Sequence, residues 1–104
     1  MIVEQRRYGL VPGGAVRYLE AWWSRGRNAQ VRHLGDPLGV LTVETGQLNT
    51  VVFLWQYADA SDRETRRAAL AADPDFAEFR RTVRELVVSQ HNEILTPSSR
   101  TERR

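Results

Sequence analysis

The segment from Thr50 to Tyr57 is apolar on both faces when it is read as a β-strand. Successive side chains of a strand point to opposite faces. A strand of this kind needs cover on both sides. A chain of 104 residues offers few helices for that purpose, so we expect the second face to meet another copy and predict a homodimer. One face carries Val52 and Leu54, and the other carries Val51, Phe53, Trp55 and Tyr57.

The first half of the chain predicts a strand, a helix and a second strand before this segment. Ile2–Tyr8 is a predicted strand that ends at Gly9, and Leu38–Thr45 is the second strand. Between them a helix is predicted over residues 15–32, because small and apolar residues recur at helical spacing. The short connection at 46–49 predicts that the second and third strands form an antiparallel hairpin. The recurring helical residues are Ala15, Leu19, Trp22, Gly26 and Ala29.

The second half predicts two further helices. Ser61 and Glu64 have the spacing of a capping box, which predicts that Ser61 caps the start of a helix that runs to about Ala72. Asp73 followed by Pro74 predicts a new helix with Asp73 as its cap. The expected buried face of this helix consists of Phe76, Phe79, Val83, Leu86 and Val87.

A last strand is predicted over Ser89–Leu95, and it completes the order strand, helix, strand, strand, helix, strand. This is the βαββαβ pattern of the α+β, ferredoxin-like fold, in which helices cover one face of a four-stranded antiparallel sheet. Residues 1–97 are expected to form a single domain. Residues 98–104 are polar and are expected to form a disordered tail.

The charge pattern argues against nucleic-acid binding. All fifteen lysine or arginine residues are arginine, and the formal net charge at pH 7 is only +2. Acidic residues are interleaved with the arginines, which predicts solvated helix faces and no specific nucleic-acid partner. For the arginines of the last two helices, ion pairs with nearby carboxylates are the simpler interpretation, and an acidic partner is the alternative. These arginines are Arg63, Arg66, Arg67, Arg80, Arg81 and Arg84.

The sequence also lacks the signals of several other classes. No cysteine is present, so disulfides and thiolate metal sites are excluded. The two histidines lack the spacing of a metal site, and no metal is predicted. No apolar run reaches the roughly 18 residues of a membrane helix, so no membrane partner is expected. The first residues lack the apolar core of a signal peptide, and a cytoplasmic location is therefore expected.

Charged residues on the first strand are the strongest candidates for a functional site. Glu4, Arg6 and Tyr8 alternate on one side of this strand. The strand is central in the predicted topology, so its charged groups need partners. One interpretation is a polar cluster that lines a cavity. The other is a Glu4–Arg6 ion pair, either within the chain or across an interface.

Aromatic and histidine side chains supply further candidates. Trp55 and Tyr57 share a face of the third strand, where they either wall a ligand pocket or pack in a core or interface. His33 lies at the predicted end of the first helix, where it either interacts with the helix dipole or contacts a ligand. His91 has a serine and a glutamate two residues away on the same strand face. Such neighbours lie about 7 Å apart, too far for a catalytic triad, so a polar edge strand is favoured.

Several short motifs, taken together, resemble the NIPSNAP family. The resemblance runs in order from about Ile2 to Pro97. It implies a dimeric α/β barrel, which agrees with the predicted ferredoxin-like fold and with the strand that is apolar on both faces. The motifs are Glu4–Tyr8, Pro12–Gly13, Arg32–Gly35, Leu38–Gly39, Leu48–Asn49, Leu54–Tyr57, Asp62–Arg67 and Ser89–Leu95.

The resemblance implies an assembly more clearly than a reaction. Related dimeric α/β barrels include cofactor-free monooxygenases, haem-degrading enzymes and small-molecule binders, so the fold permits function without specifying it. Our leading interpretation is a dimeric barrel whose cavity binds a small organic molecule, as a cofactor-free oxygenase, an isomerase-like enzyme or a binder. The alternative is a non-enzymatic interaction or scaffold module. The candidate ligand-binding residues are Glu4, Arg6, Tyr8, Trp55 and Tyr57, and the catalytic candidates are His33 and Tyr8.

Overall fold

The computed structural model describes residues 1–98, and they form the predicted ferredoxin-like fold. The four strands of its sheet are antiparallel and lie in the order β2-β3-β1-β4, so β1 is central, as predicted. Residues 99–104 of the predicted tail lie outside the described part of the chain. The strands are β1 (Ile2–Leu10), β2 (Gly39–Thr42), β3 (Thr50–Tyr57) and β4 (Val87–Leu95).

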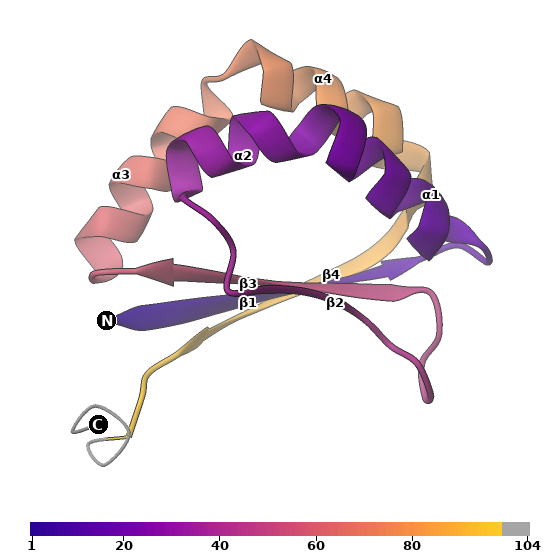
Figure 1. The fold of residues 1–104 in the computed structure, drawn as a ribbon, viewed down its shortest axis with the longest axis horizontal. Coiled ribbons are helices and arrows are strands. Elements are labelled where there is room, and N and C mark those ends of the chain that lie inside the picture. Colours follow the sequence, from indigo (N-terminus) through magenta and orange to yellow (C-terminus); the bar gives the residue numbers. More distant parts are fainter. Residues whose placement is uncertain (99–104) are drawn as a thin grey trace.

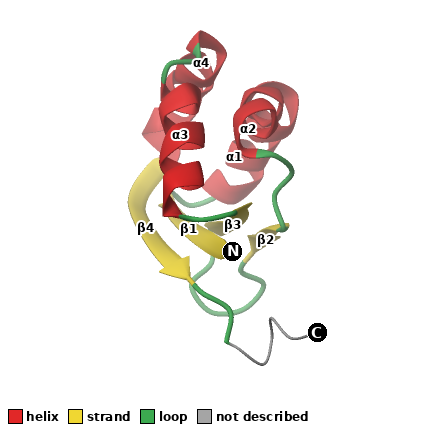
Figure 2. Ribbon diagram, turned by 90° about the vertical axis from the view of Figure 1, so that its left-hand side faces the viewer, coloured by secondary structure: helices red, strands yellow, loops and turns green. Residues whose placement is uncertain are grey.

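The helices of residues 1–98 lie on one face of the sheet in two adjacent rows (Figure 1). The side view shows two layers, with strands below and helices above (Figure 2). The first row consists of α1 (Gly14–Ala21), the π-helical turn η1 (Trp22–Gly26) and α2 (Arg27–Leu34). The second row consists of α3 (Ala60–Ala71), α4 (Pro74–Val83) and the short 3₁₀ turn η2 (Arg84–Leu86).

The core lies between these two layers. The side of β3 that carries Val51, Phe53, Trp55 and Tyr57 is buried beneath the helices, and its aromatic residues meet large side chains from both helix rows. Trp22 packs edge-on against Phe53 with a ring-centroid distance of 5.1 Å. The predicted stripe of the last helix is confirmed within α4, where Phe79 and Val83 are buried and Phe76 packs partly buried on the core. The other two predicted residues pack on the core from outside the helix, Leu86 in η2 and Val87 at the start of β4. The two faces of β3 therefore have different environments, and residues 1–98 cover only one of them with helices.

The predicted helix over residues 15–32 extends from Gly14 to Leu34 and contains a π-helical turn at its centre. The turn brings the two helix rows together at Gly26. A Cβ atom at this position would lie 2.8 Å from the ring of Phe79. Glycine therefore lets the aromatic ring sit directly on the backbone of η1. Periodicity placed Gly26 on the buried face, but it did not reveal the wider turn.

The predicted cap of α3 is wrong, whereas the predicted cap of α4 is confirmed. Helix α3 begins one residue before Ser61, and its cap is Asp59, whose carboxylate accepts a hydrogen bond from the Asp62 N–H at 2.8 Å. An extended aspartate accepts such a bond as readily as a serine, so the earlier residue takes the role. Asp73 caps α4 by accepting from the Asp75 N–H, and Pro74 occupies the first turn.

Four strand boundaries also differ from the prediction. β1 continues past the predicted end at Tyr8 to Leu10, and β2 begins at Gly39 instead of Leu38. β2 ends at Thr42, because the chain beyond it bends away into a loop with positive φ at Gly46 and Asn49. β4 begins at Val87, two residues before the predicted start. The register shifts between Gly9 and Leu10, so that Val87 pairs with Leu10 and Ser89 pairs with Gly9, and the register skips Val88. The predicted third strand, Thr50–Tyr57, matches β3.

Candidate functional site

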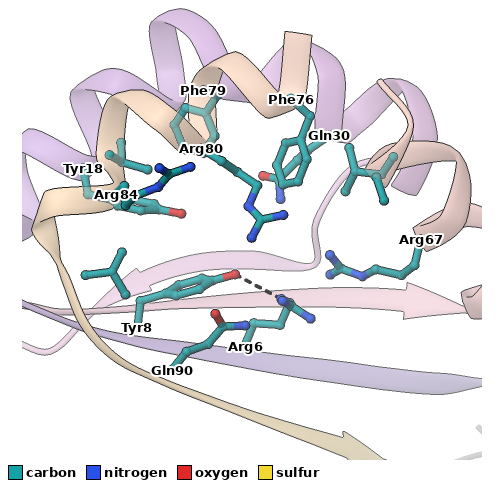
Figure 3. Close-up of a pocket in the computed structure, with 14 residues that line it drawn as sticks. Arg6, Tyr8, Tyr18, Gln30, Arg67, Phe76, Phe79, Arg80, Arg84 and Gln90 are labelled. Carbon is teal, nitrogen blue, oxygen red and sulfur yellow. Dashed lines mark hydrogen bonds between the residues drawn. The ribbon is translucent and has the colours of Figure 1, made fainter. Parts of the chain in front are cut away.

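A cavity of about 500 Å³ lies between the sheet and the two helix rows (Figure 3). Its volume falls within the range of roughly 300–1,000 Å³ that is common for ligand sites. Arg6 and Tyr8 point into it from β1, and Arg80 points into it from α4. The rest of the lining is largely apolar or neutral. It consists of Tyr18, Gln30, Arg67, Leu70, Ala71, Phe76, Phe79, Val83, Arg84, Val87 and Gln90.

A buried carboxylate lies beside this cavity. Glu4 has an exposed fraction of 0%, and three arginines reach it from two elements. Arg63 Nη2 lies 2.6 Å from Oε2, and Arg67 Nη2 lies 2.9 Å from Oε1. Arg6 Nη1 donates to Oε2 at 3.0 Å, and the Tyr57 hydroxyl donates to Oε1 at 3.0 Å. We call these five residues the Glu4 cluster. It ties the central strand to α3.

The Glu4 cluster keeps its carboxylate ionised. Burial alone would raise the pKa of Glu4, but the Arg63 hydrogen bond and the charges of Arg67 and Arg6 outweigh it. The pKa of Glu4 is consequently lowered to about 2. Burial also raises the pKa of Tyr57, so its phenol stays protonated and can donate to the carboxylate. One negative charge therefore holds three guanidinium groups in place.

Arg6 links the Glu4 cluster to the cavity. Its Nε donates to the Tyr8 hydroxyl oxygen at 3.0 Å, while its Nη1 is held by Glu4. Tyr8 in turn stacks on Tyr18, with ring centroids 5.6 Å apart. Because Tyr8 accepts this hydrogen bond through its oxygen, its own proton remains available for a ligand. The arrangement presents a fixed cation beside a hydroxyl donor.

The structure brings some of the predicted site residues together and places others elsewhere. Glu4, Arg6 and Tyr8 lie together. The Glu4–Arg6 ion pair forms within the chain, Arg6 and Tyr8 line the cavity, and Glu4 is buried beside it without lining it. Tyr57 belongs to the Glu4 cluster but does not line the cavity. Trp55 is fully buried and stacks parallel to Phe53, also away from the lining.

His33 is held by a different set of residues. Its Nε2 lies 2.8 Å from Oδ2 of Asp73, which also accepts from Arg32 at 2.6 Å. The hydrogen bond from Arg32 leads the interactions that lower the pKa of Asp73. These contacts join the end of α2 to the start of α4, and His33 is not among the residues that line the cavity. His91 is exposed on β4, where it pairs in register with Arg7.

Four arginines of the last two helical segments have roles that local ion pairing did not predict. Ion pairing with near neighbours is confirmed for Arg66, which contacts Asp62. For Arg63 and Arg67 the local interpretation is wrong, since both reach Glu4 across the fold. Arg80 and Arg84 line the cavity. Each pair has i,i+4 spacing, which places both side chains on one helix face. This spacing was the one feature of the sequence that could have indicated a shared role for the two arginines of each pair.

Within residues 1–98, no group of three or more histidine, cysteine, aspartate or glutamate residues is arranged to hold a metal ion. No helix in this part of the chain is both long and apolar enough to cross a membrane.

Comparison with known proteins identifies the family. The NIPSNAP profile matches residues 3–101. The chain belongs to the NIPSNAP family. An uncharacterised NIPSNAP-like domain protein from Burkholderia xenovorans is 40% identical, with 94% of this chain and 85% of that chain covered and a TM-score of 0.91. A NIPSNAP family protein of unknown function from Agrobacterium tumefaciens is 35% identical, with 94% and 88% covered and a TM-score of 0.90. No curated protein matches the chain.

More distant structures share the fold of this NIPSNAP chain. A dimeric ferredoxin-like protein from an uncultured marine organism is 10% identical, with 94% of this chain and 89% of that chain covered and a TM-score of 0.74. A protein from Nitrosomonas europaea, provisionally named an antibiotic biosynthesis monooxygenase, is 15% identical, with 93% and 98% covered and a TM-score of 0.67. These likenesses establish the fold alone.

Proposed function

We propose that this NIPSNAP protein binds a small organic molecule in the cavity between its sheet and helices. The observation that carries the proposal is the Arg6–Tyr8 pair, which projects into a cavity of about 500 Å³. A ligand oxygen there would accept from the guanidinium of Arg6 and from the hydroxyl of Tyr8. Glu4 and Tyr57 do not line the cavity. Glu4 holds Arg6 and Arg67 through ion pairs, and the Tyr57 hydroxyl accepts a hydrogen bond from Arg67. A scaffold module has no need for such a pre-positioned donor pair.

The same pair supports a catalytic form of the proposal. An oxygenase or an isomerase-like enzyme that uses no cofactor has to stabilise negative charge as it develops on a substrate oxygen. A guanidinium and a phenol held in advance at one point supply such stabilisation without reorganising. The alternative, a non-enzymatic interaction module, would use the dimer and leave the cavity empty.

Ligand binding is tested by titrating benzoate into the protein by calorimetry or NMR. Arg6→Ala is expected to weaken binding by about tenfold or more, because a hydrogen bond to a charged group contributes about 1.5–3 kcal/mol. Tyr8→Phe removes only the hydroxyl and should weaken binding less. Arg81→Ala is the control, because Arg81 lies on the outer surface of α4 and pairs with Glu78. Unchanged affinity in both site variants would refute the proposal.

We further propose that the protein is a homodimer built through the uncovered face of its sheet. Alternation along the strands directs Leu41, Val52 and Leu54 to the side opposite the helices, and Leu41 is 53% exposed. Pairing these faces in two copies would give the dimeric α/β barrel expected from the sequence. The dimeric fold neighbour supports this arrangement.

Light scattering at micromolar concentration is expected to give the mass of a dimer. An interface of this obligate kind commonly buries about 2,000 Å² or more in total. Leu54→Asp would place a charge at the centre of the uncovered face and should yield monomers. Val16→Asp, on the exposed outer surface of α1, should leave the dimer intact. A wild-type chain that remains monomeric would overturn the proposal.

A further inference from the structure

The cavity carries more positive charge than the described chain balances. Its lining includes Arg6, Arg67, Arg80 and Arg84 but no aspartate or glutamate. The neighbouring carboxylate, Glu4, already serves Arg6, Arg63 and Arg67. Within residues 1–98, neither Arg80 nor Arg84 forms an ion pair, and Arg80 instead lies over the ring of Phe76 at 5.9 Å. The excess charge is therefore greatest on the α4 side.

The four guanidinium groups enter the cavity from two sides (Figure 3). Arg6 and Arg67 lie toward the sheet, where the Glu4 cluster fixes them. Arg80 on α4 points down toward the sheet, and Arg84, four residues later in η2, projects from the helix layer beside Tyr18. We call these the lower and upper arginine pairs. A ligand between the sheet and α4 would therefore contact cationic groups on two opposite sides.

The space between the two pairs suits an organic body. Its apolar lining includes Leu70, Phe76, Phe79, Val83 and Val87. The upper arginines are exposed and therefore solvated when the cavity is empty. A ligand that fills the cavity removes part of this water, which is costly unless the ligand supplies negative charge on that side. A single charge can satisfy only one of the two pairs when the ligand spans between them.

We propose that the cavity is selective for organic dianions, with one negative group held by the lower arginine pair and the second held by the upper pair. This inference rests on the proposed function and names the class of its ligand. Arginine suits the role because its charge is permanent and its planar fork matches carboxylate and phosphate oxygens. The upper pair then determines specificity, whereas the lower pair provides binding common to all anionic ligands.

A series of probes with one aromatic ring and different charges tests the selectivity. Isophthalate carries two carboxylates, benzoate carries one, and benzamide carries none. At constant ionic strength and neutral pH we expect isophthalate to bind about tenfold or more tightly than benzoate, because its second carboxylate gains charged hydrogen bonds. Benzamide should bind more weakly than either. The preference for isophthalate should also decrease as salt is added, since the upper pair is exposed.

The double variant Arg80→Gln with Arg84→Gln isolates the upper pair. It should reduce the preference for isophthalate over benzoate to about twofold or less, while the affinity for benzoate changes little. Arg81→Gln removes a charge from the same helix outside the cavity and should keep the full preference. Circular dichroism of each variant checks that its helices are retained.

The outcomes separate this inference from the proposed function. If benzoate and isophthalate bind equally well to the wild type, or if the double variant keeps the preference, the dianion inference is overturned and the binding proposal stands. If none of the three probes binds, both are overturned.

Discussion

Replacing Phe79 by alanine is expected to lower the free energy of unfolding by about 3–5 kcal/mol, the usual cost of removing a buried phenylalanine. The side chain is 1% exposed and lies between the two helix rows. It packs against the backbone of η1 at Gly26 and makes an edge-to-face contact with Tyr18, with ring centroids 5.6 Å apart. An alanine would remove both contacts, and the adjoining backbone cannot collapse fully into the space.

Urea titration followed by circular dichroism measures this loss. Phe79→Leu should cost clearly less than Phe79→Ala, because leucine retains most of the buried apolar volume. Val16→Ala serves as a control on the exposed outer surface of α1, where a change within about 0.5 kcal/mol is expected. A loss below 1 kcal/mol for Phe79→Ala would mean that α4 contributes little to the core.

The elements of this fold follow from local patterns in the chain. β3 matches its prediction because five successive apolar residues, Val51 to Trp55, fill both faces of the strand. Helix α4 follows from the Asp73–Pro74 start signal and its apolar stripe. Boundaries were less predictable, because two acceptable caps, Asp59 and Ser61, lie two residues apart. Tertiary contacts also shift them, as the register change beside β4 shows.

The β1 residues of the candidate site could be predicted from the sequence, but their partners on α3 could not. Alternation along β1 grouped Glu4, Arg6 and Tyr8, since neighbours on a strand face are set by the backbone. Two further partners of Glu4, Arg63 and Arg67, lie 59 and 63 positions away on α3. An arginine on a helix can pair with a carboxylate three or four residues away or with one elsewhere in the fold, and sequence alone does not show which carboxylate it contacts. Because Glu4 is buried and its charge needs compensation, ion pairs between Glu4 and the distant arginines Arg63 and Arg67 are favourable.

Replacing Glu4 by glutamine is expected to destabilise the protein by about 3–5 kcal/mol at neutral pH, the cost of breaking a buried ion pair by removing one partner. Glutamine keeps nearly the same shape, so the change isolates the charge. Three guanidinium groups, of Arg6, Arg63 and Arg67, would then face each other without a counter-charge. The matched control is Glu78→Gln, which removes a carboxylate from an exposed ion pair with Arg81 and should cost about 1 kcal/mol or less.

The pH dependence identifies the charge as the cause. The pKa of Glu4 falls from an ordinary 4.5 to about 2 in the folded protein, and this difference corresponds to about 3 kcal/mol of stability. Because the folded pKa is the lower one, the stabilisation is fully present above pH 4.5 and is lost as the pH falls toward 2. The difference between wild type and Glu4→Gln in urea titrations should therefore narrow over this range. If the difference in unfolding free energy stays constant from pH 7 to pH 2, the loss comes from packing and not from charge. The Glu4 charge would then not be what fixes the arginines of the cavity.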